Sequence, residues 1–136
     1  MENNLYILGT KISVVNSSQA LEKAEHFIDS GQKHLIVTPY SESVVAAYTD
    51  KEFQEIINGS SLSIPDGGGL LAAADYLQYQ LPNNKYLRFL FAVFLGLWVG
   101  IKLALFRKSF KVLKEPVHGT DLLVSICSLS TRRSIK

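Results

Sequence analysis

The stretch from Ser61 to Leu77, SLSIPDGGGLLAAADYL, constrains the fold more than any other part of the sequence. An apolar run ends at Pro65, one carboxylate follows at Asp66, and three glycines lead into residues that favour a helix. Because proline interrupts a central strand and glycine permits a tight turn, this order predicts a strand, a loop and then a helix. A lone acid at the start of a glycine loop can serve binding or catalysis as well as folding.

The N-terminal residues predict two short strands and a helix. Residues 5–15, LYILGTKISVV, favour a hairpin with Gly9 and Thr10 as its turn. The residues after the hairpin have apolar side chains at helical spacing. Asn16 and Gln19 stand three apart, like the partners of a capping box, so the helix is expected to begin there.

Strand and helix patterns then alternate. HLIVT is a continuous apolar run, as in the buried strands of a parallel sheet. Two helices are expected over residues 41–49 and 50–59, the second capped by Asp50, and SLSI is the next strand. The alternation predicts an α/β fold with a Rossmann-like, mainly parallel sheet and flanking helices. A chain of 136 residues has room for one domain, 1–136.

Two polar residues stand at the ends of predicted parallel strands. Thr38 ends the strand HLIVT, and Asp66 follows the strand SLSI after one proline. In such sheets, ligands bind beyond the carboxyl ends of the strands. We therefore expect Thr38 and Asp66 to lie on the same rim of the sheet.

Three interpretations of the glycine loop remain open. Gly67-x-Gly69-x-x-Ala72 fits a dinucleotide-binding loop, but that site also needs an acid about 20 residues further on to hold the ribose. Asp75 is the only acid in that interval, and it lies in the same predicted helix. In the second interpretation the glycines only form a tight turn. In the third, Asp66 takes a proton from an attacking hydroxyl, and the glycines let a bulky substrate approach the backbone.

The sequence lacks the usual metal-binding patterns. His26, His34 and His118 are scattered, and no D-x-D pair is present to hold a metal-bound nucleotide diphosphate. We therefore expect no metal and no other cofactor, with backbone donors and basic side chains neutralising any diphosphate. Cys127 is the only cysteine, which excludes an internal disulfide and agrees with a reducing cytoplasm. The N-terminus has no signal-peptide pattern.

The segment 85–114 has a different composition. It holds seven of the 14 Lys and Arg residues and none of the 12 Asp and Glu residues. Its stretch Phe89–Ile101 has no charged or polar side chain, and as a helix spans about 20 Å, against about 30 Å for a hydrocarbon core. We therefore expect a helix or shallow hairpin that lies on an anionic membrane surface, with a core helix as the alternative. The expected membrane contacts are Arg88, Trp98, Lys102, Arg107, Lys108 and Lys111.

Three motifs, in this order, resemble the WecG/TagA/CpsF glycosyltransferases: VTPYSE (37–42), IPDGGG (64–69) and GTDLL (119–123). The opening ILGTKISVVNSSQALEKAEHFI is also similar to the first strands and helix of that family. The resemblance implies an inverting hexosyltransferase that moves an N-acetylmannosamine-type sugar from a UDP donor. The implied acceptor is N-acetylglucosamine on undecaprenyl diphosphate, in teichoic acid or surface polysaccharide synthesis.

The resemblance also implies roles for individual residues. Asp66 is the implied general base, and Thr38 lines the same pocket. The other implied substrate contacts are Tyr40, Gly67, Gly68, Gly69, Gly119, Thr120 and Asp121. Tyr40 stands where the family usually has Asn, and Pro116 stands where it usually has Arg.

Members of the family are longer, and their further strands complete the sheet. The chain is therefore expected to be an N-terminal portion, incomplete at its C-terminus, inactive alone and able to self-associate through an unpaired sheet edge. Residues 85–114 are expected to be an insertion, because the family usually has a short connection there. A lipid-linked acceptor implies a position on the cytoplasmic face of the plasma membrane, and nucleic acid is not an expected partner.

Two other classes of function remain as alternatives. One is a non-catalytic membrane-associated module in which the α/β part is a scaffold for the apolar segment. The other is a dinucleotide-binding oxidoreductase. Binding of a UDP-sugar distinguishes the transferase from both.

Overall fold

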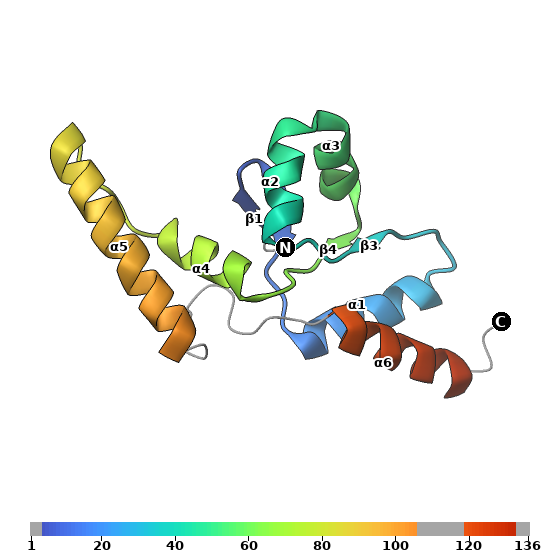
Figure 1. The fold of residues 1–136 in the computed structure, drawn as a ribbon. Coiled ribbons are helices and arrows are strands. Elements are labelled where there is room, and N and C mark those ends of the chain that lie inside the picture. Colours follow the sequence, from blue (N-terminus) through green and yellow to red (C-terminus); the bar gives the residue numbers. More distant parts are fainter. Residues whose placement is uncertain (1–3, 106–118, 133–136) are drawn as a thin grey trace.

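The computed structural model describes residues 4–105 and 119–132 of the chain. Four short strands and six helices occur in these residues (Figure 1): β1 (Asn4–Ile7), β2 (Thr10–Ser13), α1 (Ser17–Asp29), β3 (Ile36–Val37), α2 (Ser41–Thr49), α3 (Lys51–Gly59), β4 (Leu62–Ser63), α4 (Gly68–Tyr76), α5 (Lys85–Leu105) and α6 (Gly119–Arg132). The predicted alternation of strands and helices is confirmed, and with it the α/β class.

The N-terminal hairpin and the helix after it follow the sequence closely. β1 and β2 pair antiparallel, and Leu8 and Gly9, with φ of 50° and 81°, form the turn one residue before the predicted position. Positive φ at both residues suits the twist of a two-residue hairpin. The predicted capping box at the start of α1 is confirmed: the Gln19 backbone N–H donates to Asn16 Oδ1 (2.8 Å), and the Asn16 backbone N–H donates to Gln19 Oε1 (3.0 Å).

The described residues do not form the mainly parallel, Rossmann-like sheet that the sequence predicts. β3 and β4 pair parallel over two residues each, whereas β1 and β2 form a separate antiparallel sheet. β2 contacts β4, but side chains join them: the Ser63 N–H donates to Ser13 Oγ (3.2 Å), and Ser63 Oγ donates to the Lys11 carbonyl (2.7 Å). Serine hydroxyls therefore replace the backbone ladder that would make one sheet.

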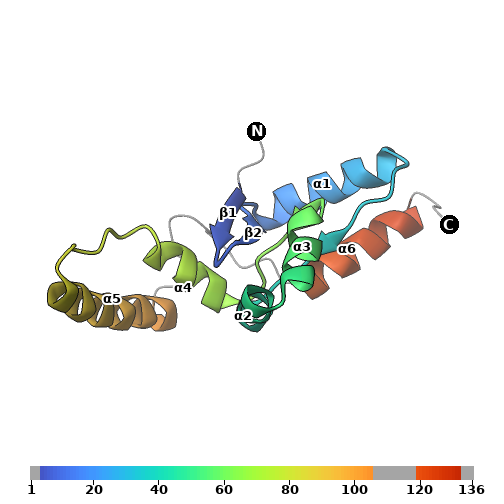
Figure 2. The same cartoon turned by 90° about the horizontal axis from the view of Figure 1, so that it is seen from above.

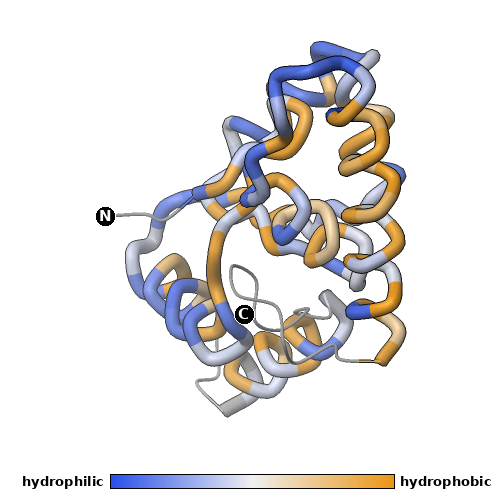
Figure 3. The backbone as a smooth tube through the Cα atoms, turned by 90° about the vertical axis from the view of Figure 1, so that its left-hand side faces the viewer, coloured by the Kyte–Doolittle hydropathy of each residue, from blue (hydrophilic) through white to orange (hydrophobic). Residues whose placement is uncertain are grey.

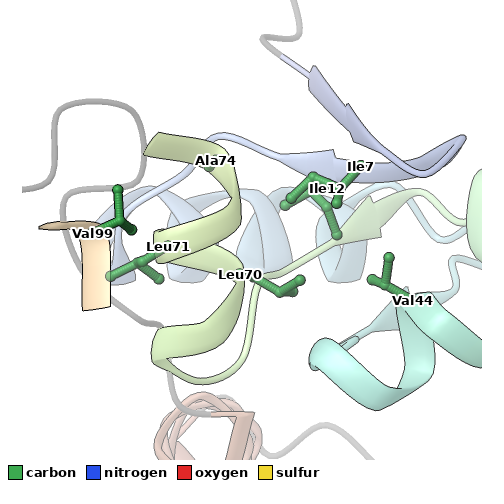
Figure 4. Close-up of a cluster of buried hydrophobic side chains, with 7 residues drawn as sticks. All are labelled: Ile7, Ile12, Val44, Leu70, Leu71, Ala74 and Val99. Atoms are coloured by element: carbon green, nitrogen blue, oxygen red, sulfur yellow. The ribbon is translucent and has the colours of Figure 1, made fainter. Parts of the chain in front are cut away.

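The buried side chains form two clusters. The first cluster joins the hairpin, α2, α4 and α5 through Ile7, Ile12, Val44, Leu70, Leu71, Ala74 and Val99 (Figure 4). The second joins α1, β4 and α6 through Ala20, Leu62, Ile64 and Leu122. α1 and α6 accordingly lie side by side at one end, and α5 lies at the other (Figures 1 and 2).

α5 is a single helix of 21 residues with little protein around it. Asn84 caps its start, because Asn84 Oδ1 accepts from the backbone N–H groups of Tyr86 and Leu87 (3.0 and 3.4 Å). The tube in Figure 3 is coloured as hydrophobic along most of this helix, yet only 6% of its most apolar stretch is buried. By length and composition it is the one helix within 4–105 and 119–132 that could cross a membrane. The rest of the predicted segment 85–114 lies outside the described residues.

Candidate functional site

The parallel pair of strands sets Thr38 beside Asp66. Beyond β3 and β4 the pairing continues, because the Ile64 N–H donates to the Val37 carbonyl (2.8 Å) and the Asp66 N–H donates to the Pro39 carbonyl (2.9 Å). The backbone of Asp66 is therefore fixed at the carboxyl end of the neighbouring strand. This confirms the expectation that Thr38 and Asp66 share one rim.

The glycines after Asp66 allow the chain to turn directly into α4. Gly67 is the N-cap of α4 and has a φ of 83°, a conformation that favours glycine. At Gly69 a Cβ would collide with Ser41 Oγ of α2, so the absence of a side chain lets the two helices approach. The half-buried Asp66 side chain stands just before this turn.

α6 begins directly against Thr38. A Cβ added at Gly119 would lie 3.0 Å from Thr38 Cγ2 and 3.1 Å from Thr38 Oγ1. These distances are closer than ordinary van der Waals contact, so a larger residue at this position has to displace the threonine. The start of α6, distant in sequence from both strands, is thus brought to the rim that holds Thr38 and Asp66.

Together these elements line an open pocket of about 410 Å³. Asp66, Thr38 and Thr120 supply its polar side chains, and Gly119 also lines it. The rest of its lining is apolar: Ile36, Leu122, Leu123 and Ile126. A volume of this size is within the range of small-molecule sites in proteins.

The pocket gathers four of the predicted site residues, Thr38, Asp66, Gly119 and Thr120. Tyr40, Gly67, Gly68, Gly69 and Asp121 do not line it. Tyr40 is the half-exposed N-cap residue of α2, and the three glycines lie at the start of α4 beside Asp66. Asp121 is exposed in the first turn of α6, where its carbonyl accepts from Ser125 Oγ (2.8 Å). Their predicted roles in binding stay predictions.

The sequence patterns did not predict the apolar wall of the pocket. Leu122, Leu123 and Ile126 come from the first two turns of α6, and Ile36 comes from β3. The spacing of Leu122 and Ile126 places both on one face of a helix, which is a readable signal. The sequence pattern alone did not indicate that this face would turn toward Thr38 rather than only toward α1.

Two of the expected membrane contacts, Arg88 and Trp98, are exposed on α5. Lys102 is placed differently: its Nζ lies 2.7 Å from Oδ2 of Asp75 on α4, and its side chain is 13% exposed. Arg107, Lys108 and Lys111 lie outside the described residues.

The chemistry that the pocket can offer follows from these groups. A carboxylate at the rim can accept a proton, and two threonine hydroxyls can donate to or accept from a polar ligand. The backbone N–H groups of the first turn of α6 lack partners within the helix and favour an anion. Within residues 4–105 and 119–132, no group of three or more His, Cys, Asp or Glu side chains could hold a metal ion.

A family model described as "Glycosyl transferase WecG/TagA/CpsF family" matches residues 5–97, more than half of the chain. The match includes Thr38, Asp66 and the first part of α5, and it ends before the GTDLL residues of α6. No curated protein matches the chain.

Proposed function

Because the chain belongs to the WecG/TagA/CpsF family of glycosyl transferases, we propose that the pocket between β3, Asp66 and α6 is where a sugar is transferred. The donor is a UDP-linked sugar of the N-acetylmannosamine type. The acceptor is N-acetylglucosamine on undecaprenyl diphosphate, and the product serves teichoic acid or surface polysaccharide synthesis. The observation that carries this proposal is the backbone hydrogen bond from the Asp66 N–H to the Pro39 carbonyl, which fixes the backbone of the acid beside a pocket that Asp66 lines together with Thr38 and Thr120.

In this mechanism Asp66 is the general base. Its carboxylate takes the proton of the acceptor hydroxyl while the hydroxyl oxygen bonds to the anomeric carbon of the donor sugar. The bond between that carbon and the diphosphate oxygen breaks, and UDP leaves with the electron pair. Attack from the face opposite the leaving group inverts the anomeric configuration.

Charge on the diphosphate develops as the sugar leaves, so donors near it lower the barrier. The first turn of α6, with Gly119 and Thr120 at the pocket, supplies backbone N–H groups and the positive end of a helix dipole. These N–H groups and the helix dipole would neutralise the diphosphate in place of a metal ion, and the proposed transfer uses no metal.

The acceptor is anchored in a bilayer, so the enzyme has to work at that surface. The exposed apolar helix α5, with basic residues and no acidic residue along it, suits an anionic membrane surface. We therefore place the protein on the cytoplasmic face of the plasma membrane. We also propose that the two separate sheets, linked by the Ser63 hydrogen bonds, belong to a Rossmann-like core.

The test is transfer of labelled sugar from the UDP donor to the lipid-linked acceptor by the complete gene product and its Asp66→Asn variant. Asparagine keeps the size of the side chain but cannot take the proton. Near wild-type turnover in the variant would remove Asp66 from the role. Transfer that is absent from the unaltered protein, together with absent UDP-sugar binding, would reject the transferase.

A second candidate is a non-catalytic membrane-associated module. The observation that favours it is the exposed apolar surface of α5, which requires a partner whether or not the pocket is active. In that case the pocket binds no UDP-sugar, and the protein binds membranes whether or not a UDP-sugar is present. Isothermal titration with the UDP-sugar and flotation with liposomes separate the two candidates.

A further inference from the structure

α5 carries its charged side chains on one side only. Lys85, Arg88 and Lys102 are the charged residues of this helix, and Leu95 and Val99 are spaced between them at intervals of three, four or seven. At 3.6 residues per turn these positions lie along a single stripe. Val99 is buried against α4, and Leu95 packs on the same cluster, so this stripe is the side of α5 that faces the protein.

The opposite side of α5 is apolar along its whole length. It consists of exposed residues without a charge among them: Tyr86, Leu90, Val93, Phe94, Leu97, Ile101 and Leu105. Phe94 is 65% exposed and Leu97 is 61% exposed, although both are large and apolar. We call these seven residues the outer face.

An ion pair holds the stripe onto α4. Lys102 Nζ and Asp75 Oδ2 are 2.7 Å apart, and their side chains are 13% and 3% exposed. Leu71 of α4 lies next to Val99 of α5, whereas Leu70 is on the side of α4 toward Ile12 and Val44 (Figure 4). A buried charge is stable only while it is paired, so the ion pair allows few rotations of α5 about its own axis.

The contacts with α4 limit how α5 can meet a bilayer. The packing residues Leu95, Val99 and Leu103 all belong to the C-terminal half of the helix. The ten residues before them, 85–94, span about 15 Å, which is half of a hydrocarbon core of about 30 Å. A crossing helix would have to pull α4 and the Asp75–Lys102 pair into hydrocarbon.

We propose that α5 lies along an anionic leaflet, outer face in the acyl chains, and that the Asp75–Lys102 pair sets this rotation. The inference rests on the proposed function and deepens it, because it names which surface of the transferase meets the lipid. Lys85 and Arg88, exposed at the free end of the stripe, then lie at the level of lipid phosphates.

The arrangement also ties the lipid surface to the catalytic residue. α4 begins at Gly68, two residues after Asp66, and carries Asp75 near its other end. One short helix therefore connects the Asp66 loop with the helix that rests on the leaflet. The ion pair is a positioning device: it fixes the height and orientation of the pocket relative to an acceptor held in the same leaflet.

Trp98 is the only tryptophan, so fluorescence can measure the depth of single positions on α5. Two variants place a tryptophan on the outer face: Trp98→Phe with Leu90→Trp, and Trp98→Phe with Ile101→Trp. The two positions are 11 residues apart, about 16 Å along the helix. The full chain is bound to vesicles of phosphatidylcholine and phosphatidylglycerol that carry bromine at known depths in the acyl chains.

If α5 lies along the leaflet, both tryptophans are quenched at the same depth, just below the headgroups. Depths that differ by about 16 Å mean a crossing helix and overturn the inference, while membrane association and the transferase proposal stand. Absence of quenching at both positions overturns the inference and also the proposed membrane location, but not sugar transfer, which is measured separately.

The ion pair is tested by exchange of its charges. Lys102→Met leaves Asp75 unpaired, so α5 should turn about its own axis or detach, and both tryptophans should be quenched together at a shallower depth. Asp75→Lys with Lys102→Asp restores a pair and should restore the original depth at both positions. Circular dichroism confirms that each variant is folded. Depths in the folded Lys102→Met variant that are unchanged from those of the unaltered pair would show that the pair does not set the rotation, and would overturn that part of the inference.

Discussion

The two ends of the molecule differ in what their apolar side chains contact. At the end formed by α1, β4 and α6, Leu62 and Ile64 are buried among other side chains, and the apolar wall that remains open faces a pocket. At the other end, α5 buries Val99 alone and leaves a complete outer face exposed. At the first end, other side chains of the protein bury these apolar residues. At the second end, the outer face can be buried only by another molecule. The proposed transfer, from a soluble sugar donor to a lipid-bound acceptor, would use one surface of each kind.

The largest effect is expected at the pocket. Asp66→Asn should lower turnover by roughly 10²–10⁴-fold, the usual consequence of losing a general base. Vesicle binding should not change, because α5 is untouched. Steady-state transfer and flotation, measured on the same preparation, check both halves of this prediction. A parallel loss of vesicle binding would show that the two ends are not separable.

The next effect is expected where α4 meets α5. Lys102→Met should lower the free energy of unfolding by about 3–5 kcal/mol, because it leaves the carboxylate of Asp75 buried without its cation. The matched control is Asp75→Leu with Lys102→Met, which should be near neutral or stabilising, since no charge remains buried. Denaturant titration gives both values. A single variant as stable as the unaltered chain would mean that water reaches Asp75.

A smaller effect is expected on the outer face. Leu90→Gln should weaken binding to anionic vesicles by about 10- to 100-fold, corresponding to the loss of burying one leucine in an apolar surrounding. Ala92→Gln, on the stripe side of the same helix, is the matched control and should bind almost normally. Flotation at several lipid concentrations gives the ratio. Equal losses in the two variants would remove the distinction between the faces.

The smallest effect is expected at the start of α6. Gly119→Ala should lower turnover by about 10-fold, because its Cβ would lie 3.0 Å from Thr38 Cγ2 and has to displace that side chain. Gly59→Ala is the control, since a Cβ at Gly59 meets nothing within 4 Å. Initial rates of transfer decide the comparison. An unaffected Gly119→Ala enzyme would mean that Thr38 need not keep its place.

The local elements were predictable where one residue type dictates the backbone. Asn16 and Gln19 form their capping box, Asp50 caps α3 through the Phe53 N–H (3.0 Å), and Gly67 takes the positive φ that starts α4. The rim was predictable for a related reason, since the carboxyl ends of adjacent parallel strands meet. These features depend on short-range geometry, which a single sequence contains.

The sheet and the pocket wall were not predictable in the same way. The link between β2 and β4 depends on the Ser13 hydroxyl meeting Ser63 across 50 residues, and nothing in either strand indicates it. The position of α6 against Thr38 depends on Gly119 having no side chain. Asp75 gave no signal of its partner, because Lys102 is 27 residues away on another helix. Long-range contacts between ordinary residues leave no local pattern.

We infer that the pocket carries out catalysis and that α5 gives access to the acceptor. The most direct measurement compares transfer to an acceptor embedded in vesicles with transfer to a water-soluble short-chain acceptor, for the complete gene product and two variants. Asp66→Asn should lose transfer to both acceptors, and Leu90→Gln should lose transfer to the embedded acceptor only. Equal loss on both acceptors in Leu90→Gln, or transfer by Asp66→Asn at the unaltered rate, would contradict this division of roles between the pocket and α5.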